Sequence, residues 1–309
     1  MPIQNDKLNY LHFFNKIGYN IGSNYIQNVD VHNYKSFDFF PDLAMFFAAY
    51  TVKKTFSRPT AAPKFIKNSI CFFFKNVFGD VHSKKDEKPF IRIFPASYTY
   101  TSIFKKDSRV KTVSVLISAE YLKGFLQNDA EKFQYLFDTS NDFLIEEIMT
   151  DDIVRTINDI VKNEAPATLA DYHYKLKAME LIFHLFKSLS KRAQSAHQQL
   201  SDKDIKSIYK VRDKLVSSFD KPTTIAELKQ IAGMNELKMR KIFTQVFGMG
   251  IYDYYQHFRM HEAARLIREE KLSVSEAGYQ TGFENLSHFS RTFEKYIGQK
   301  PKKYALKIS

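Results

Sequence analysis

The chain has 309 residues and a formal net charge of +12, which results from 46 Lys and Arg residues against 34 Asp and Glu residues. This length is sufficient for two domains that each bury a core, and the excess of positive charge favours an anionic partner, either nucleic acid or a membrane surface. The single cysteine, Cys71, excludes a disulfide within the chain and a zinc site made of several cysteines.

The sequence carries no sign of secretion or of membrane insertion. The first residues, MPIQNDKLNY, lack the basic and then apolar pattern of a signal peptide. No stretch approaches the ~18 uninterrupted apolar residues of a spanning helix. Cys71 lies in the apolar run SICFFF, where burial in a strand is expected rather than the exposed thiolate of a redox sensor. We therefore expect a cytoplasmic protein that does not bind membranes.

Residues 43–117 have the composition of β-strands. The runs LAMFFAAYTV, SICFFF, FIRIF, YTYTSIF and KTVSVLI are short, rich in Phe, Tyr, Val, Ile and Thr, and separated by turns with Pro, Gly or charged residues. This pattern predicts a β-rich sensor or scaffold domain over residues 1–118, a cupin-like barrel or sandwich of antiparallel strands. Such a barrel either encloses a small ligand or is filled by its own side chains, and the sequence leaves both open.

Residues 119–200 change to helical periodicity. The segments AEYLKGFL, NDFLIEEIM and DDIVRTINDIVKN have apolar residues at steps of three and four, and a longer helix follows in TLADYHYKLKAMELIFHLFKSLSKRAQ. One stripe of this helix is suited either to packing on the sheet of its own chain or to forming the seam of a homodimer. Its residues are Tyr172, Leu176, Met179, Phe183 and Phe186, at spacings of 4, 3, 4 and 3.

Residues 201–309 are predicted to form a separate all-α domain after the polar segment QSAHQQLSDKD. Two related segments occur in this domain, GMNELKMRKIFTQVFG from Gly233 and GFENLSHFSRTFEKYIG from Gly282. Each follows a short amphipathic run, and a glycine between two short helices is typical of a helix-turn-helix unit. A predicted helix over residues 251–269, roughly 28 Å long, joins the two units. That length suits a spacer between two recognition helices in successive major grooves, about 34 Å apart.

The whole set of landmarks resembles the DNA-binding domain of AraC/XylS-type transcriptional regulators. The resemblance implies a regulator that binds double-stranded promoter DNA, activates transcription through RNA polymerase and responds to a small-molecule effector in its N-terminal domain. Within the family, the sequence of this domain is similar to the sequences of the siderophore-responsive branch, which includes the pyochelin regulator. The residues that carry the resemblance are Gly233, Met234, Phe243, Gly248, RMHEAARLI (259–267), Gly282, Phe283, SHFSRTF (287–293), Gly298, Pro301 and Tyr304.

The resemblance also assigns residues to the DNA. Arg240 and Arg291 are suited to bidentate contacts with guanine, and Leu237 and Leu286 to contacts with thymine methyls. We expect base contacts from Leu237, Arg240, Lys241, Leu286, Ser287, Ser290 and Arg291. We expect contacts with phosphates, which add affinity but little specificity, from Lys238, Lys295, Lys300, Lys302 and Lys303. We expect core positions for Met239, Ile242, Phe243, Phe289 and Phe293.

The sequence departs from the family pattern near the middle of the first helix of each unit. A small residue, commonly Ala, is usual there, but the first unit has Lys229 and the second has Gly278. A lysine can direct its charge outward, and a glycine costs up to about 1 kcal/mol of helix propensity relative to Ala. We therefore expect the two units to differ in rigidity.

Two other classes of protein remain to be weighed. A DNA-repair enzyme fused to the same domain would need a cysteine cluster, and no phosphate loop, HExxH or GxSxG motif is present. His12, His32 and His82 lack the spacing of metal ligands, so we expect no metal and no cofactor. The second alternative is a regulator without an effector, gated by a protein partner or by its own abundance.

Overall fold

The computed structural model divides the chain into two compact units, unit 1 over Met1–Gln199 and unit 2 over Leu200–Ser309. The structure describes residues 2–17, 21, 23–39, 42–59, 68–76, 90–99, 101–137, 143–162, 166–192, 200–217, 219 and 222–308. Each unit has its own hydrophobic core. The prediction of a β-rich N-terminal region followed by helices, and of an all-α C-terminal region, is confirmed.

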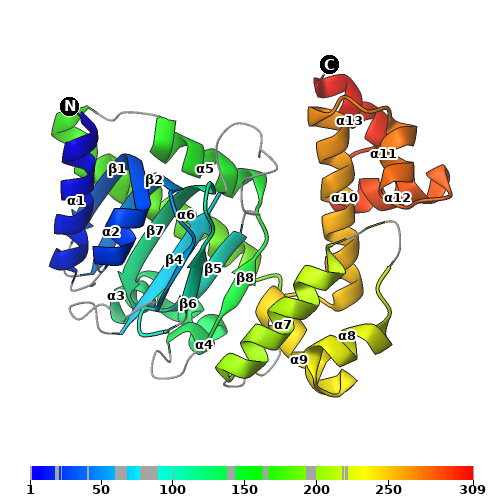
Figure 1. The fold of residues 1–309 in the computed structure, drawn as a ribbon, viewed down its shortest axis with the longest axis horizontal. Helices are drawn as coiled ribbons and strands as arrows, with labels where there is room; N and C mark the ends of the chain where they lie inside the picture. Colours follow the sequence, from blue (N-terminus) through cyan, green and yellow to red (C-terminus); the bar gives the residue numbers. More distant parts are fainter. Residues whose placement is uncertain are drawn as a thin grey trace. The chain divides into compact units, whose positions relative to one another are not determined.

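Unit 1 is built on antiparallel strands. Six of them form one sheet in the order β1-β2-β7-β4-β5-β8, and β3 pairs with β6 in a second sheet (Figure 1). The five strands expected from the sequence are present. The bounds are β1 Val29–Phe39, β2 Leu43–Val52, β3 Phe56–Pro59, β4 Ser69–Lys75, β5 Phe90–Pro95, β6 Thr101–Phe104, β7 Arg109–Ser118 and β8 Ile145–Glu147.

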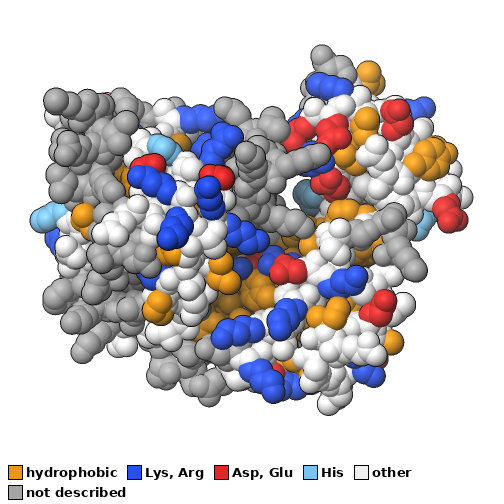
Figure 2. Space-filling view, in the orientation of Figure 1, with side chains coloured by type: hydrophobic (Ala, Val, Ile, Leu, Met, Phe, Trp, Pro, Cys, Tyr) orange, Lys and Arg blue, Asp and Glu red, His pale blue; other side chains and the backbone are white. Residues whose placement is uncertain are grey.

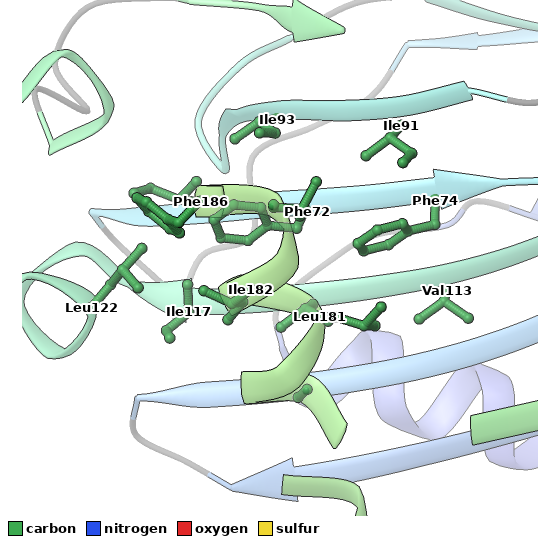
Figure 3. Packing of buried hydrophobic residues seen from close by; sticks show 14 of the residues in the cluster. Phe72, Phe74, Ile91, Ile93, Val113, Ile117, Leu122, Leu181, Ile182 and Phe186 are labelled. Carbon is green, nitrogen blue, oxygen red and sulfur yellow. The ribbon is translucent and has the colours of Figure 1, made fainter. Parts of the chain in front are cut away.

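The helices of unit 1 cover both faces of the larger sheet. On one face, alternate side chains of β2, β4, β5 and β7 pack with α6, and Figure 3 shows Leu181, Ile182 and Phe186 of this helix above Phe72 and Ile117. On the other face, rings of α1 contact Phe46 of β2. The bounds are α1 Pro2–Lys16, α2 Ser23–Asn28, α3 Ala119–Leu126, η1 Gln127–Phe133, α4 Gln134–Phe137, α5 Asp151–Lys162, η2 Ala167–Leu169 and α6 Ala170–Leu189.

The helical prediction for NDFLIEEIM is wrong, because Ile145–Glu147 form strand β8. The strand pairs with β5, with Ile93 opposite Ile145 and Ile91 opposite Glu147. Ile145 enters the core, and the exposed edge of β5 supplies hydrogen bonds that a short helix would not receive from the sheet. Spacing over nine residues does not distinguish these outcomes.

A buried ion pair attaches β8 to the end of α6. Arg192 donates from Nε to Oε2 of Glu147 at 2.8 Å, and Ser188 donates to the other carboxylate oxygen at 3.0 Å. The side chains of Arg192 and Glu147 are 10% and 5% exposed. Neighbouring Glu146 accepts a hydrogen bond from Arg92 at 3.3 Å. The C-terminal end of α6 is thereby fixed to the edge of the sheet.

Among its described residues, unit 2 contains helices and no strand. Figure 2 shows Lys and Arg side chains over α7, whereas Asp and Glu side chains gather around the C-terminal half of α10 on the same face. Toward the C-terminal end of α10, Arg265 forms ion pairs with Glu262, Glu269 and Glu270, at 2.7, 3.6 and 3.0 Å. The bounds are α7 Asp202–Leu215, α8 Ile225–Ala232, α9 Glu236–Phe247, α10 Ile251–Glu269, α11 Val274–Gln280, α12 Leu286–Ile297 and α13 Pro301–Ile308.

Candidate nucleic-acid interface

The first helix-turn-helix unit is formed by α8 and α9. Thr224 and Glu227 form a capping box at the start of α8. The backbone N–H of Thr224 donates to the Glu227 carboxylate at 2.8 Å, and the backbone N–H of Glu227 donates to the Thr224 hydroxyl at 3.2 Å. Gly233 ends α8 with φ of 62°, a left-handed value that favours glycine. Asn235 caps α9 by accepting from the N–H of Lys238 at 2.9 Å, and Gly248 ends α9 with φ of 74°.

The second unit, α11 and α12, repeats these devices. Ser273 and Glu276 form the same reciprocal cap, at 2.8 and 3.2 Å. Asn285 caps α12, and Gly298 ends it with φ of 81°. The residues that cap α8 and α11, Thr224 and Ser273, are 49 positions apart in the chain. The asparagines that cap α9 and α12 are 50 positions apart. One additional residue therefore lies in the turn of the second unit.

The helix α10 contacts the second helix of each unit, α9 and α12. Tyr254 packs its ring against those of Phe243 and Phe247 of α9, at 5.2 and 5.0 Å between centroids. Further along α10, Met260, Ala263 and Ile267 share a core with α12. The prediction of core positions is confirmed, because the relevant side chains are all 0% exposed: Met239, Ile242, Phe243, Phe289 and Phe293.

Arg259 of α10 holds the turn of the second unit. Its Nε donates to the carbonyl of Thr281 and its Nη2 to the carbonyl of Gly282, each at 2.5 Å. The guanidinium carbon lies 3.7 Å from the centroid of the Phe283 ring. Burial lowers the pKa of Arg259 from its ordinary value. A buried cation therefore serves as the donor for two backbone carbonyls at the entrance to α12.

Two further contacts fasten the C-terminal end of α12 to α10. The Tyr296 hydroxyl donates to Oδ1 of Asp253 at 3.0 Å. His257 lies beside the same tyrosine, with ring centroids 6.4 Å apart. Burial, and secondarily the neighbouring His261, lower the pKa of His257 to about 3, so this ring is neutral at physiological pH. Neither these contacts nor the role of Arg259 had been identified from the sequence, because each joins residues more than twenty positions apart.

The outer face of α9 carries the side chains assigned to DNA in the first unit. Leu237 is 81% exposed, and Lys238, Arg240 and Lys241 are exposed. Glu236 accepts from Nε of Arg240 at 2.7 Å, which orients the guanidinium along the helix. Lys238 forms an ion pair with Asp204 of α7 at 2.8 Å. The predicted phosphate contact of Lys238 therefore competes with a contact inside unit 2.

The outer face of α12 differs from that of α9. Ser287 and Arg291 are exposed, but Leu286 and Ser290 are only partly so. Leu286 lies against Gly278 of α11, since a Cβ at position 278 would be 2.9 Å from Cδ2 of Leu286. The lysines assigned to phosphates on and after α12 are all exposed: Lys295, Lys300, Lys302 and Lys303.

Lys229 and Gly278 occupy different environments. Lys229 is exposed, so its charge remains in water. Gly278 is buried, and Leu286 and Phe289 of α12 take the space where a larger side chain would lie. The absence of a side chain at position 278 thus permits close packing of α11 on α12.

The residues predicted to form a dimer seam differ in their exposure. Tyr172, Leu176 and Phe183 are 67%, 55% and 58% exposed, and Met179 is partly buried against the core. Phe186 is 6% exposed and packs on Phe133, with ring centroids 4.6 Å apart. The opposite side of α6 rests on the sheet.

The described residues of unit 1 include Cys71 and two of the histidines weighed as metal ligands, His12 and His32. Within them, and within those of unit 2, no group of three or more His, Cys, Asp and Glu side chains is arranged to hold a metal ion. His32 is bonded to Thr51 at 2.7 Å, and His82 lies outside the described residues. Burial raises the pKa of the Cys71 thiol to about 12. No described helix is long and apolar enough to cross a membrane.

Comparison with known proteins places the similarity in unit 2. Residues 228–307 match the family described as a helix-turn-helix domain. The transcriptional regulator GlxA of Rhizobium meliloti is 30% identical over 91 residues, which cover 29% of this chain and 28% of GlxA. The regulatory protein PchR of Pseudomonas aeruginosa is 30% identical over 99 residues, which cover 32% of this chain and 33% of PchR. The matched part thus spans a third or less of these relatives.

Solved structures show likeness over different lengths. The DNA-binding domain of AdpA, determined in complex with a target DNA, is 19% identical with a TM-score of 0.31, and the match covers 32% of this chain and 90% of that chain. ToxT from Vibrio cholerae is 14% identical with a TM-score of 0.32, and the match covers 87% of this chain and 100% of that chain. Over residues 228–307, therefore, the chain carries a helix-turn-helix domain that is similar to those of known transcriptional regulators.

Proposed function

We propose that the chain is a sequence-specific DNA-binding regulator of transcription, in which α9 and α12 each enter a major groove of promoter DNA. The observation that carries this proposal is the duplication in unit 2. Two helix-turn-helix units with the same caps pack on one helix, and each presents polar and basic side chains outward. A recognition helix fits the major groove, and two of them on a rigid spacer read adjacent segments of one duplex.

In the proposed complex, specificity comes from the first turns of the two recognition helices. Arg240 and Arg291 each bind a guanine through two hydrogen bonds, and each such pair is worth about 1–3 kcal/mol of discrimination. Base contacts are assigned to Leu237, Arg240, Lys241, Leu286, Ser287, Ser290 and Arg291, and phosphate contacts to Lys238, Lys295, Lys300, Lys302 and Lys303. Leu286 lies against α11 and is only partly exposed, so the exposed part of its side chain would make the contact with a thymine methyl.

The proposal extends to the way in which the regulator acts. We assign it as an activator that contacts RNA polymerase at the promoter, with a small-molecule effector bound by unit 1. The alternative is gating by a protein partner or by the abundance of the chain. A shift of the thermal unfolding of unit 1 by a small molecule, together with altered DNA affinity, supports the effector. A purified chain whose DNA binding is full in the absence of any added molecule supports the alternative.

The decisive experiment is selection of random-sequence duplexes by the full chain at two salt concentrations. We expect an enriched bipartite motif whose half-sites lie about one helical turn apart. Arg240→Ala should relax the preference in one half-site, and Arg291→Ala in the other. Arg155→Ala, which removes a 73% exposed arginine from unit 1, is the matched control. Binding that vanishes as salt rises, without any enriched motif, contradicts the proposal.

A further inference from the structure

The helix α7 carries four lysines on one side, which we call the lysine stripe. Its members are Lys203, Lys206, Lys210 and Lys214, at steps of 3, 4 and 4 residues, and all four side chains are exposed. With 3.6 residues in each turn, these steps keep the four lysines within about 80° of one another around the helix axis. The opposite side of α7 is buried in unit 2 through Ile205, Ile208, Val211 and Leu215.

The charge of the lysine stripe is not balanced by the described residues. Among them, none forms an ion pair with any of the four lysines. Two acidic residues of the same helix bind other cations, since Asp204 lies 2.8 Å from Nζ of Lys238 and Asp213 lies 2.8 Å from Nε of Arg212. Like charges three and four residues apart repel one another and disfavour the helix. A basic stripe along one helix face is the electrostatic signature of a nucleic-acid contact.

The helix that carries the stripe is attached to the first helix-turn-helix unit. Tyr209 of α7 packs its ring against that of Phe247 of α9, with centroids 5.4 Å apart, and α7 also contacts α8. The ion pair of Asp204 with Lys238 joins the first turn of α7 to the first turn of α9. That end of α9 is the one that the proposed function places in the major groove, which has a phosphate backbone along each side.

We propose that the lysine stripe of α7 binds phosphates of the DNA strand that borders the groove occupied by α9. This inference rests on the proposed function and extends the contact surface beyond the two recognition helices. From Lys203 to Lys214 the stripe is about 16 Å long, at 1.5 Å per residue. Since phosphates of one strand follow one another every ~3.4 Å of the duplex axis, several lie within that length. Such contacts add affinity and fix the position of the protein on the duplex without reading its sequence.

The first test measures the DNA affinity of the full chain at several salt concentrations, on the duplex enriched by selection. The stripe variant combines Lys206→Gln, Lys210→Gln and Lys214→Gln, because glutamine keeps the helix propensity of lysine. The slope of log affinity against log salt should become shallower by about 0.9 for each lysine that meets a phosphate, and so by up to about 2.7. Because like charges are removed, the variant should unfold at the same temperature as the wild type or at a higher one. An unchanged slope overturns the proposal.

The matched control removes the same charge from unit 1. It combines Lys123→Gln, Lys162→Gln and Lys191→Gln, at three lysines that are also exposed. The control should change the slope by less than the ~0.9 expected of a single phosphate contact. Equal changes in the two variants would show an effect of net charge alone, which overturns the proposal. The proposed function would survive that result, because base contacts set the enriched motif, whereas a chain that enriches no motif overturns both.

Ethylation of the phosphates locates the contact on the duplex. The phosphates at which ethylation prevents binding should include a set beside the half-site whose preference is relaxed by Arg240→Ala. The stripe variant should lose this set, and the control should keep it. Loss beside the half-site relaxed by Arg291→Ala contradicts the placement of α7 next to α9. An unchanged pattern, together with weaker transcription by RNA polymerase in vitro, would assign the stripe to an acidic protein surface and overturn the contact with DNA.

Discussion

The Nη2 of Arg259 donates to the carbonyl oxygen of Gly282 over 2.5 Å, and this bond attaches the turn of the second helix-turn-helix unit to the long helix α10. Gly282 has φ of 78°, so its carbonyl is turned out of any helical hydrogen-bond pattern. The arginine supplies the donor that this carbonyl would otherwise lack. The direction in which α12 leaves the turn is thereby set from α10.

We predict that Arg259→Met affects the second unit selectively. The carbonyls of Thr281 and Gly282 lose their donor, and we expect the free energy of unfolding of unit 2 to fall by about 1–3 kcal/mol. DNA protection should be lost at the half-site read by α12 and retained at the half-site read by α9, as measured by footprinting. Arg268→Met, which changes a 54% exposed arginine of the same helix, is the control. Equal loss at both half-sites would refute the positioning role.

Removal of the Asp204 carboxylate should strengthen binding to phosphates. In the folded chain Asp204 holds Lys238 at 2.8 Å, and this contact must be broken before Lys238 reaches DNA. Asp204→Asn should raise DNA affinity at low salt and make the salt dependence steeper by up to about one counterion. Asp213→Asn, on the same helix but 69% exposed, controls for the change in net charge. The two variants are compared in titrations at several salt concentrations.

The same ion pair predicts a dependence of stability on pH. The hydrogen bond from Lys238 lowers the pKa of Asp204 below its ordinary value of 3.8. A carboxyl group whose pKa is lower in the folded state stabilises that state at pH values above its unfolded-state pKa. This stabilisation is lost as the pH falls through the folded-state pKa. The difference in unfolding free energy between the wild type and Asp204→Asn should therefore be constant above pH 5, roughly, and shrink in stronger acid. A difference that grows on acidification would contradict this assignment.

Gly278→Ala should change the DNA sequence preference of the second unit with only a small change in its stability. The new methyl group gains about 1 kcal/mol of helix propensity, but it displaces Leu286, whose Cδ2 lies 2.9 Å from the position of the added Cβ. Because the end of a leucine side chain can move, we expect a net change in stability within about 1 kcal/mol. The altered position of Leu286 should change the sequence preference of the second half-site only. Lys229→Ala, at the exposed equivalent position, should change neither quantity.

We expect Glu147→Gln to loosen the end of α6 in unit 1. Loss of one partner leaves the Arg192 guanidinium buried without its carboxylate, which costs about 3–5 kcal/mol. Hydrogen–deuterium exchange should rise in β8 and in the last turn of α6. Asp129→Asn breaks an exposed pair with Lys132, in which Asp129 is 65% exposed, and should cost under about 1 kcal/mol. Similar exchange in both variants would show that the buried pair does not fix α6.

The parts of the fold that depend on local pattern were predictable from the sequence. The two recognition helices could be placed because their glycines, caps and apolar spacing act within a dozen residues. The long helix α6 was equally clear, since its periodicity extends over five turns. By contrast, β8 was predicted as helix, because three residues give no period and its strand conformation comes from pairing with β5.

The candidate site was predictable as a set of exposed side chains but not as a packed arrangement. Leu286 was expected to contact a base, and the structure adds that it is partly covered, because Gly278 lets it approach α11. Lys238 was expected to be available for phosphate, yet Asp204 binds it from a helix more than thirty residues earlier. Long-range contacts of this kind leave no mark in the spacing of a single sequence.

The additional residue in the turn between α11 and α12 makes the two halves of unit 2 unlike. With the proposed function, a chain whose halves differ does not prefer the same bases at both ends of its site. The DNA segment bound by one chain is therefore not expected to be an inverted repeat. The protein should bind such a segment in one orientation relative to the promoter. Inverting such a site should reverse which end of the regulator lies nearest the start of transcription.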